Sequence, residues 1–368
     1  MGFPTSRRLF LRWGTISVLA ALHRRIANAY TPRQVRIGAI RWDAWYSPDT
    51  LPGSSEWYAA HDLDPDAFHY RAPFFAEQVG KERMSINGTQ SSIDAEIDYA
   101  ANAGIDYWAF GWYQEGRPLH KAWEYYQASP QRERVKWCAL IGLNSLAQRF
   151  PPTANLISSF RQSNYERFGD RPLLYVMHEK TEIASARRSL ELIRSECVSA
   201  GIGDPYVVIQ CSVAKTGASD AEAINADAIS AYASAPAISN GPVSYLVLDR
   251  FVRNFWTQMV RTGVAVVPNV MTGWDRRPRI RQPPPFDSYR AKATEYVVPG
   301  SPNEIANHVK AAIGFVKSHP SACPSKSILI YSWNECDEGG SVLCPTWSEH
   351  GPAHEVLDAV SRVLSETR

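Results

Sequence analysis

Eight short apolar runs recur along the chain, and segments with helical periodicity separate them. Each run is apolar without alternation, which is typical of strands that are buried on both faces of a parallel sheet. Parallel strands need a crossover segment, usually a helix, between them. The runs occupy residues 35–42, 107–112, 136–143, 173–177, 206–211, 228–232, 264–268 and 328–333.

The intervening segments carry recognisable helix ends. Ser91 or Ser92 is expected to cap a helix that Gly104 ends, because serine accepts hydrogen bonds from free backbone N–H groups and glycine adopts the left-handed conformation at a helix end. Ser301 precedes Pro302 and is expected to cap another helix. Further helical segments are expected over 181–200, 302–318 and 354–367.

Eight strand–helix units in succession favour an α/β fold, a single-domain (β/α)8 TIM barrel over residues 30–368. A doubly wound open sheet is the alternative, but no Gly-x-Gly-x-x-Gly follows the first strand. Two long βα connections stand out, residues 43–90 after the first strand and 269–301 after the seventh. Because active sites of barrels lie at the carboxyl ends of the strands, both connections are expected to border the site.

The N-terminus predicts export. Arg7 and Arg8 precede Phe10 and a modest apolar stretch, and an Ala-x-Ala cleavage site ends at Ala29. Residues 1–29 therefore resemble a bacterial twin-arginine signal peptide, which implies a periplasmic or secreted protein. A basic amphipathic tail is the alternative, and the apolar stretch is too short for a membrane span.

Composition narrows the partners. Hydrophobic residues make up 45% and charged residues 21%, as in a soluble globular protein, and 12 Trp and 17 Tyr suit either sugar stacking or a large core. Loss of residues 1–29 removes five arginines and no acid, which takes the formal charge from +2 to −3. A mildly acidic chain without a basic patch argues against nucleic acid as a partner. Nothing indicates an oligomeric state.

Six cysteines suit an exported protein without proving disulfides. Cys138 and Cys211 lie in apolar runs and are expected to be buried thiols, whereas Cys344 could pair with Cys336 or Cys323. No Cys-x-x-Cys or His-x-x-x-His spacing occurs, so neither a metal nor another cofactor is expected. A metal site built from His178, Glu179 and Asp275 has no ligand spacing to support it.

The strand ends collect aromatic rings, carboxylates and amides, which is the mixture that a pyranose binds. Glu335 and Glu338 follow the last strand, where ionised groups are costly, so catalysis is the favoured explanation for them. Some of the strand-end residues could have a structural role instead. Trp42 could belong to the core, and Asp275 could form an ion pair with nearby arginines. The proposed sugar-binding set is Trp42, Asp43, Trp45, Tyr113, Trp274, Asp275, Arg279 and Asn334.

Three stretches resemble glycoside hydrolase family 99 and its relatives, which include domains associated with polysaccharide-biosynthesis loci. SWNECDEGG (332–340) is similar to the family's Asn-Glu-x-x-Glu-Gly signature. PNVMTGWDRRPR (268–279) is similar to its Gly-Trp-Asp-x-x-x-Arg segment, and residues 96–113 resemble its early helix and aromatic strand. The departure is Cys336, at a position that often holds an aromatic residue.

The resemblance implies a retaining glycoside hydrolase of α-linked glycans, endo-α-mannosidase-like, in which Glu335 acts as a base on the sugar's 2-hydroxyl. Glu338 would then protonate the leaving oxygen and later activate water. The pair requires one carboxylate that stays ionised and one whose pKa is raised, and Asp337 between them is expected to point away and bond to loop backbone. A non-catalytic glycan-binding or polysaccharide-assembly barrel is the alternative.

Overall fold

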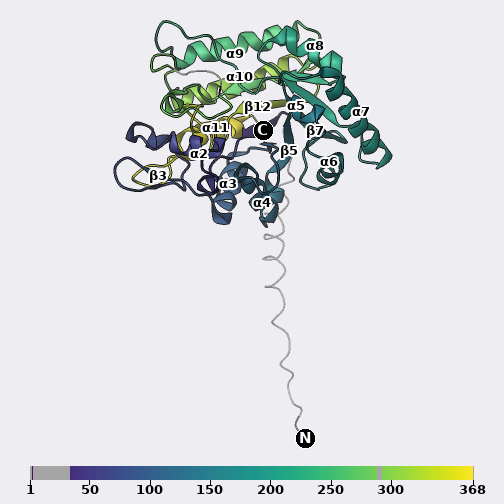
Figure 1. The fold of residues 1–368 in the computed structure, drawn as a ribbon. Helices are drawn as coiled ribbons and strands as arrows, with labels where there is room; N and C mark the ends of the chain where they lie inside the picture. Colours follow the sequence, from purple (N-terminus) through teal and green to yellow (C-terminus); the bar gives the residue numbers. More distant parts are fainter. Residues whose placement is uncertain (1, 3–33, 288–291, 368) are drawn as a thin grey trace. The chain divides into compact units, whose positions relative to one another are not determined.

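Parallel strands form the central sheet, as the apolar runs predict (Figure 1). This computed structural model describes residues 2, 34–287 and 292–367. Neighbouring strands along the path from β10 to β11 are all parallel, and only the short β6 (Arg167–Phe168), which lies off this path, pairs antiparallel with β7 among the described strands of the sheet. The strands are β1 (Arg36–Arg41), β4 (Tyr107–Gly111), β5 (Lys136–Gly142), β7 (Arg171–Met177), β8 (Tyr206–Gln210), β9 (Ala228–Ser230), β10 (Ala265–Val266), β11 (Asn269–Met271) and β12 (Ser327–Tyr331).

The sheet closes through one interrupted strand. Its order begins with β10 and ends with β11, which only Val267 and Pro268 separate in the chain. Val267 N donates to Ile229 O of β9 at 2.9 Å, and Leu329 N of β12 donates to Pro268 O at 3.0 Å. Because proline has no N–H, the strand changes partners there. Counting β10 and β11 as one strand gives the predicted (β/α)8 barrel.

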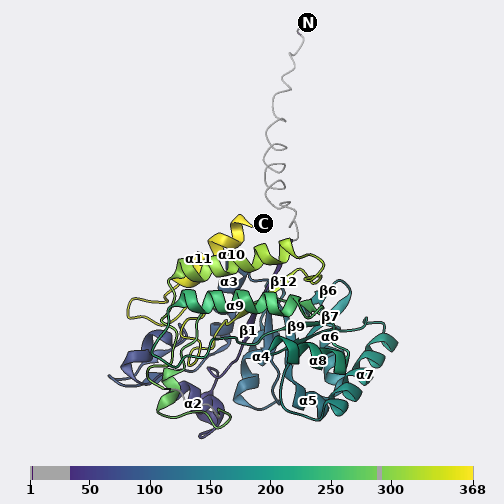
Figure 2. The same ribbon diagram turned by 90° about the horizontal axis from the view of Figure 1, so that it is seen from above.

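Helices surround the sheet, and sequence neighbours contact one another around it (Figures 1 and 2). Contacts link α3 to α4, α7 to α8, α8 to α9, α9 to α10, α10 to α11 and α11 back to α3. The helices are α3 (Gln90–Ala103), α4 (Pro118–Ala128), α5 (Leu143–Ala147), α6 (Thr153–Phe160), α7 (Ile183–Ser199), α8 (Ala214–Ile224), α9 (Tyr245–Val260), α10 (Pro302–Ser318) and α11 (Glu355–Glu366).

Most helix ends agree with the sequence, with one correction. Ser301 caps α10 through a capping box with Glu304, and Gly104 ends α3 at a φ of 90°. The cap of α3, however, is Thr89 rather than Ser91 or Ser92. Ser92 is the third residue of that helix, and its side chain accepts from Thr89 N at 3.1 Å. The run Thr89-Gln90-Ser91-Ser92 consists of four hydroxyl-bearing or amide residues, which made the start of the helix ambiguous.

The two long connections contain short regular elements in the residues that the structure describes. Residues 43–90 contain the short helix α2 (Ser55–His61), two 3-10 turns and the small hairpin of β2 (Glu77–Gln78) and β3 (Met84–Ser85). The connection after the seventh strand begins at Thr272 rather than residue 269, because Asn269–Met271 pairs with β12. It contains the 3-10 turn Arg277–Ile280.

A buried ion network supports the first strand. Arg41 is fully buried, donates to Asp43 and Glu96, and lies 4.4 Å from the Trp108 ring centroid. Burial raises the pKa of Glu96, and Arg41 opposes this shift. Removal of one member would leave an uncompensated buried charge. The network therefore holds Asp43, the first residue of the 43–90 connection, against Arg41 of β1.

The remaining sequence predictions have mixed outcomes. All six cysteines are free and buried, as predicted for Cys138 and Cys211, and neither suggested pairing of Cys344 is formed. The predicted export signal over 1–29 lies outside the described residues. Among the helices that the structure describes, none is long and apolar enough to cross a membrane.

Candidate active site

The loop that follows β12 brings Glu335 and Glu338 to one cleft. Both side chains are largely buried, and both line a cavity of about 690 Å³ at the carboxyl ends of the strands. Its walls come from β4, β5, β7 and both long connections, and include Trp42, Glu56, Trp112, Tyr113, Arg117, Leu119, Phe150, Met177, Glu179, Tyr232, Arg279 and Phe286.

One helical turn of backbone places the two glutamates together. Gly339 N donates to Glu335 O at 2.8 Å, and Glu335 N donates to Ser332 Oγ at 2.9 Å. Residues three apart on such a turn share a face. A Cβ on Gly339 would lie 2.8 Å from Glu335 O, and Gly340 has a φ of 78°, so both positions require glycine.

Glu335 lies in an apolar and acidic environment. Its Oε1 accepts a hydrogen bond from the Tyr232 hydroxyl. Burial raises the pKa of Glu335 well above its ordinary value, and the negative charges of Glu338 and Asp337 raise it further. Arg279 opposes the shift without cancelling it. Glu335 is therefore the carboxyl of the pair that tends to hold a proton.

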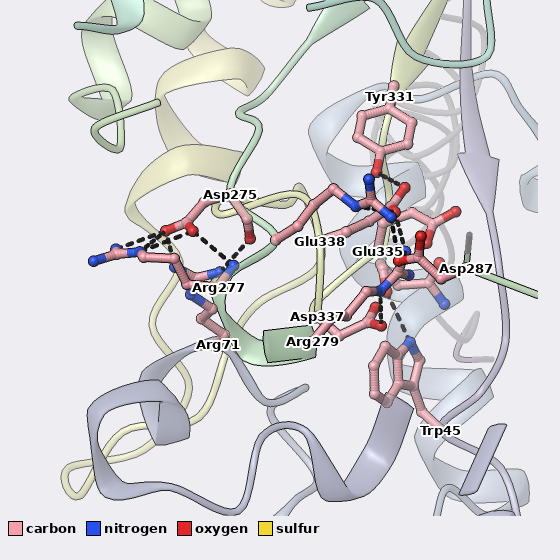
Figure 3. A network of polar contacts seen from close by, with 12 residues as sticks. Trp45, Arg71, Asp275, Arg277, Arg279, Asp287, Tyr331, Glu335, Asp337 and Glu338 are labelled. Atoms are coloured by element: carbon pink, nitrogen blue, oxygen red, sulfur yellow. Dashed lines mark hydrogen bonds and ion pairs between the residues drawn. The ribbon is translucent and has the colours of Figure 1, made fainter. Parts of the chain in front are cut away.

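Glu338 has charged partners instead. Its Oε2 accepts from Arg279 Nη1, and its Oε1 accepts from the Tyr331 hydroxyl (Figure 3). Arg276 Nε lies 3.8 Å from Oε2. Burial alone would lower the pKa of the Arg279 guanidinium, but Asp337 and Glu338 raise it well above its ordinary value. Glu338 thus lies against two guanidinium groups and one hydroxyl.

Asp337 differs from its expected role. Instead of bonding to loop backbone, its Oδ2 accepts from Arg279 Nε at 2.7 Å, so Arg279 holds Asp337 and Glu338 together (Figure 3). The two glutamates also differ from each other in their surroundings. Glu335, the expected base, has the raised pKa, and Glu338, the expected acid, is paired with a cation.

The first-strand candidates divide into lining and supporting residues. Trp42 and Tyr113 line the cleft, and Trp42 Nε1 donates to Tyr113 Oη at 2.9 Å. Asn334 lies behind them, where its amide accepts from Trp42 N at 3.0 Å and donates to Asp43 Oδ1 at 2.8 Å. Trp45 Nε1 donates to Asn334 O at 2.7 Å. Asn334, Asp43 and Trp45 thus support the wall and do not line it.

The candidates after the seventh strand divide similarly. Arg279 lines the cleft, whereas Asp275 is fully buried and accepts from Arg71 and Arg277 (Figure 3). Burial opposes the shift, but these two arginines lower the pKa of Asp275 below its ordinary value. The Trp274 ring packs on Tyr331 with centroids 6.0 Å apart. Asp275 therefore forms a buried ion pair with arginines, which is the structural role that the sequence left open for it.

The suggested metal ligands do not meet. His178 Nδ1 lies 2.7 Å from Asp220 Oδ2, and Glu179 Oε2 accepts from Asn144 N at 3.0 Å. Across residues 34–287 and 292–367, no group of three His, Cys, Asp or Glu side chains is arranged to hold a metal ion.

Sequence reasoning missed three contributors to the site. Tyr331 is the last residue of an apolar strand and resembles a core residue in the sequence. Asp287 contacts both Arg276 and Arg279, but lies in a proline-rich segment without periodicity. Glu56 reaches the cleft from α2, far from any strand end. Tyr232 differs from these three residues, because it ends the predicted strand 228–232 and its polar hydroxyl at that place is a signal in the sequence.

Asp62 offers a test of this buried acidic region. It is 2% exposed, and neither carboxylate oxygen has a hydrogen-bond partner. Burial raises its pKa to about 9, and Asp337 adds to the shift. An unfolded aspartate has a pKa of about 3.9. Between these values the folded protein holds a proton that the unfolded chain has lost, so Asp62 reduces stability progressively as pH rises.

Asp62→Asn removes this pH dependence. We expect the variant to gain about 1–3 kcal/mol over the wild type between pH 6 and pH 8, in urea unfolding at both values. The exposed Asp358→Asn on α11 is the control and should show no such trend. A stability difference for Asp62→Asn that does not change with pH would contradict the assignment.

The barrel, with a carboxylate pair at its mouth, has the fold of a glycoside hydrolase family 99 enzyme. The endo-alpha-mannosidase of that family from Bacteroides thetaiotaomicron, in complex with BIS-TRIS-propane, is 14% identical and superposes with a TM-score of 0.54 over 90% of this chain and 97% of that one. A second structure described as the same enzyme gives 12% identity and a TM-score of 0.51 over the same shares. The predicted resemblance to this fold is confirmed.

The family follows from the sequence. The model of the family described as Glycosyltransferase WbsX matches residues 148–353, more than half of the chain, and the chain belongs to this family. The match covers the segments of both carboxylates and of Arg279. No curated protein matches the chain in sequence.

Proposed function

We propose that this protein cleaves glycosidic bonds of an α-linked glycan, with Glu335 and Glu338 as the working carboxylates. One observation carries the proposal: both glutamates project from a single backbone turn into the same cleft. Glycoside hydrolysis needs one carboxyl that donates a proton and one that is ionised. The environments of the two carboxyls differ, because burial raises the pKa of Glu335 whereas Glu338 forms an ion pair with Arg279.

The cleft also suits the substrate. Trp42, Trp112 and Phe286 line it with rings, and Tyr113 and Tyr232 add hydroxyl groups. Aromatic faces stack on the apolar faces of pyranoses, and hydroxyls exchange hydrogen bonds with the sugar. The endo-alpha-mannosidases that share the fold support an α-linked substrate.

Arg279 keeps a second candidate function open. It forms an ion pair with Glu338 in the free protein. This ion pair would hinder a hydrolase, which needs Glu338 for the reaction, more than a glycan-binding or polysaccharide-assembly protein. The family's description as a glycosyltransferase fits such a role, in which a sugar acceptor takes the place of water. Hydrolysis requires that the substrate's hydroxyls replace or share the bond from Arg279 to Glu338.

A glycan panel separates the two functions. Purified protein is incubated with α-mannan, α-glucan and bacterial α-linked polysaccharides, and reducing ends are counted with and without added acceptor oligosaccharides. We expect new reducing ends from at least one glycan in water alone. Binding without release in water would contradict hydrolysis, and products formed only with an acceptor would identify a transferase.

We also propose that the protein acts outside the cytoplasm, on the basis of the twin-arginine pattern in residues 1–29. Fractionation of a bacterium that expresses the full chain, compared with an Arg7→Lys, Arg8→Lys variant, tests this. Retention of both proteins in the cytoplasm would contradict export.

A further inference from the structure

A third carboxylate in the cleft has no hydrogen-bond partner. Glu56, in the first turn of α2, is 0% exposed and lines the same cavity as Glu335 and Glu338. Neither Oε1 nor Oε2 accepts a hydrogen bond. Arg117 Nη2 is 3.5 Å from Oε1, and the Arg117 side chain is 47% exposed. The arginine provides a nearby charge and leaves the acceptor capacity of Glu56 unused.

This arrangement is unfavourable for the protein alone. Buried carboxylates are normally satisfied by hydrogen bonds, because the loss of water is otherwise uncompensated. Two other buried acids near the site bond directly to a cation, Asp337 to Arg279 and Asp43 to Arg41. Glu56 differs from them because it lines a cavity, so the missing donors can come from a ligand there.

Glu56 lies near the carboxylate pair. Burial raises the pKa of Tyr113 above its ordinary value, and the negative charges of Glu335 and Glu56 both contribute. Tyr113 therefore senses both acids, and all three residues line one cavity. A glycan that fills this cavity therefore lies against the walls that contain Glu335 and Glu56.

The charges of the cleft narrow the ligand. Its walls contain the carboxylates of Glu56, Glu179, Glu335 and Glu338 against the guanidinium groups of Arg117 and Arg279. Acids exceed cations, and three of the four acids, Glu56, Glu179 and Glu335, accept no hydrogen bond from an arginine. Anionic groups are repelled from such a surface, whereas hydroxyl and amine donors are attracted.

We propose that Glu56 is a binding residue of this cleft, which accepts hydrogen bonds from vicinal hydroxyls or from an amine of the bound sugar. The cleft consequently takes neutral or amino sugars in preference to uronic acids. The inference rests on the glycan-binding part of the proposed function and does not require hydrolysis. The chemistry shared by the two sugar types is a pair of hydrogen-bond donors that both oxygens of Glu56 can accept.

Binding measurements test the proposal on the full-length protein. Calorimetry with α-mannotetraose, maltotetraose, tetraglucosamine and tetragalacturonate compares the wild type with Glu56→Gln. Gln keeps the shape and loses the charge, so the expected loss of affinity for the best neutral or amino probe is about tenfold or more. Glu222→Gln, at an exposed position on α8, is the matched control with unchanged affinity.

The outcomes separate clearly. Tetragalacturonate should bind the wild type at least about tenfold more weakly than the best neutral or amino probe. Unchanged affinity in Glu56→Gln, equal or tighter binding of tetragalacturonate, or no binding of any probe would each overturn the proposal. Tight binding of a neutral probe that is never cleaved would contradict the hydrolase function and leave the role of Glu56 intact.

Discussion

Glu338→Gln is expected to lower the rate of glycan cleavage by roughly 10²–10⁴-fold, while the dissociation constant for the same glycan changes little. The amide cannot exchange a proton or carry the negative charge that the reaction needs. Folding should survive, because Arg279 keeps Asp337 and Asp287 as partners and the Tyr331 hydroxyl can donate to the amide oxygen. Initial rates of reducing-end release, with calorimetry of binding, measure both quantities.

The same measurements on Glu335→Gln show which of the two glutamates is the general acid that protonates the leaving group. An aryl glycoside with an acidic phenol as leaving group needs no protonation, so only the variant that lacks the general acid recovers activity with it. The free protein's charges predict recovery for Glu335→Gln, since burial and Glu338 raise the pKa of Glu335. Recovery of Glu338→Gln instead would show that ligand binding transfers the proton, as the family resemblance implies. Wild-type rates in Glu338→Gln would remove it from the mechanism.

The barrel was predictable because its signals are local. Each strand is a continuous apolar run, and cues such as Ser301 before Pro302 mark helix ends within a few residues. The closure of the sheet into a barrel was predictable only from the number of strand–helix units. The change of partner at Pro268 depends on contacts with β9 and β12, which no local pattern encodes.

The pairing of charges at the site was not predictable. Glu335 and Glu338 stood out because acids after a buried strand are unusual. Arg279 is 58 positions from Asp337 and 59 positions from Glu338 in the sequence. Whether it binds a sugar or these two carboxylates depends on the path of the 272–301 connection. The same holds for Glu56, whose approach to the cleft requires the path of the 43–90 connection.

The geometry of Arg279 has a consequence for stability as well as for chemistry. Its guanidinium is 3% exposed and contacts Asp287, Asp337 and Glu338, so it is the centre of a buried cluster of acids. Arg276 is the second cation there and contacts Asp287 and Glu338. Two arginines thus hold three carboxylates close together in the wall of the cleft.

Arg279→Met is expected to destabilise the fold by about 3–5 kcal/mol, because removal of one partner leaves buried charges uncompensated. The loss should be greater at pH 8 than at pH 5. Burial raises the pKa of Asp337 and Arg279 opposes this, so the variant raises it further. The folded variant then holds a proton that the unfolded chain loses as pH rises, and stability falls across that interval.

Urea unfolding at pH 5 and pH 8 measures this difference, with Arg261→Met at the exposed end of α9 as the control.

The rate of glycan cleavage by Arg279→Met, at a pH where the variant is folded, then shows how the arginine affects Glu338. If Arg279 keeps Glu338 ionised for the reaction, the rate falls along with stability. If it blocks Glu338 in the free protein, the rate rises although the fold is weaker, because sugar hydroxyls no longer compete with a guanidinium. A loss of stability, relative to the wild type, that is equal at pH 5 and pH 8 would contradict the buried cluster itself.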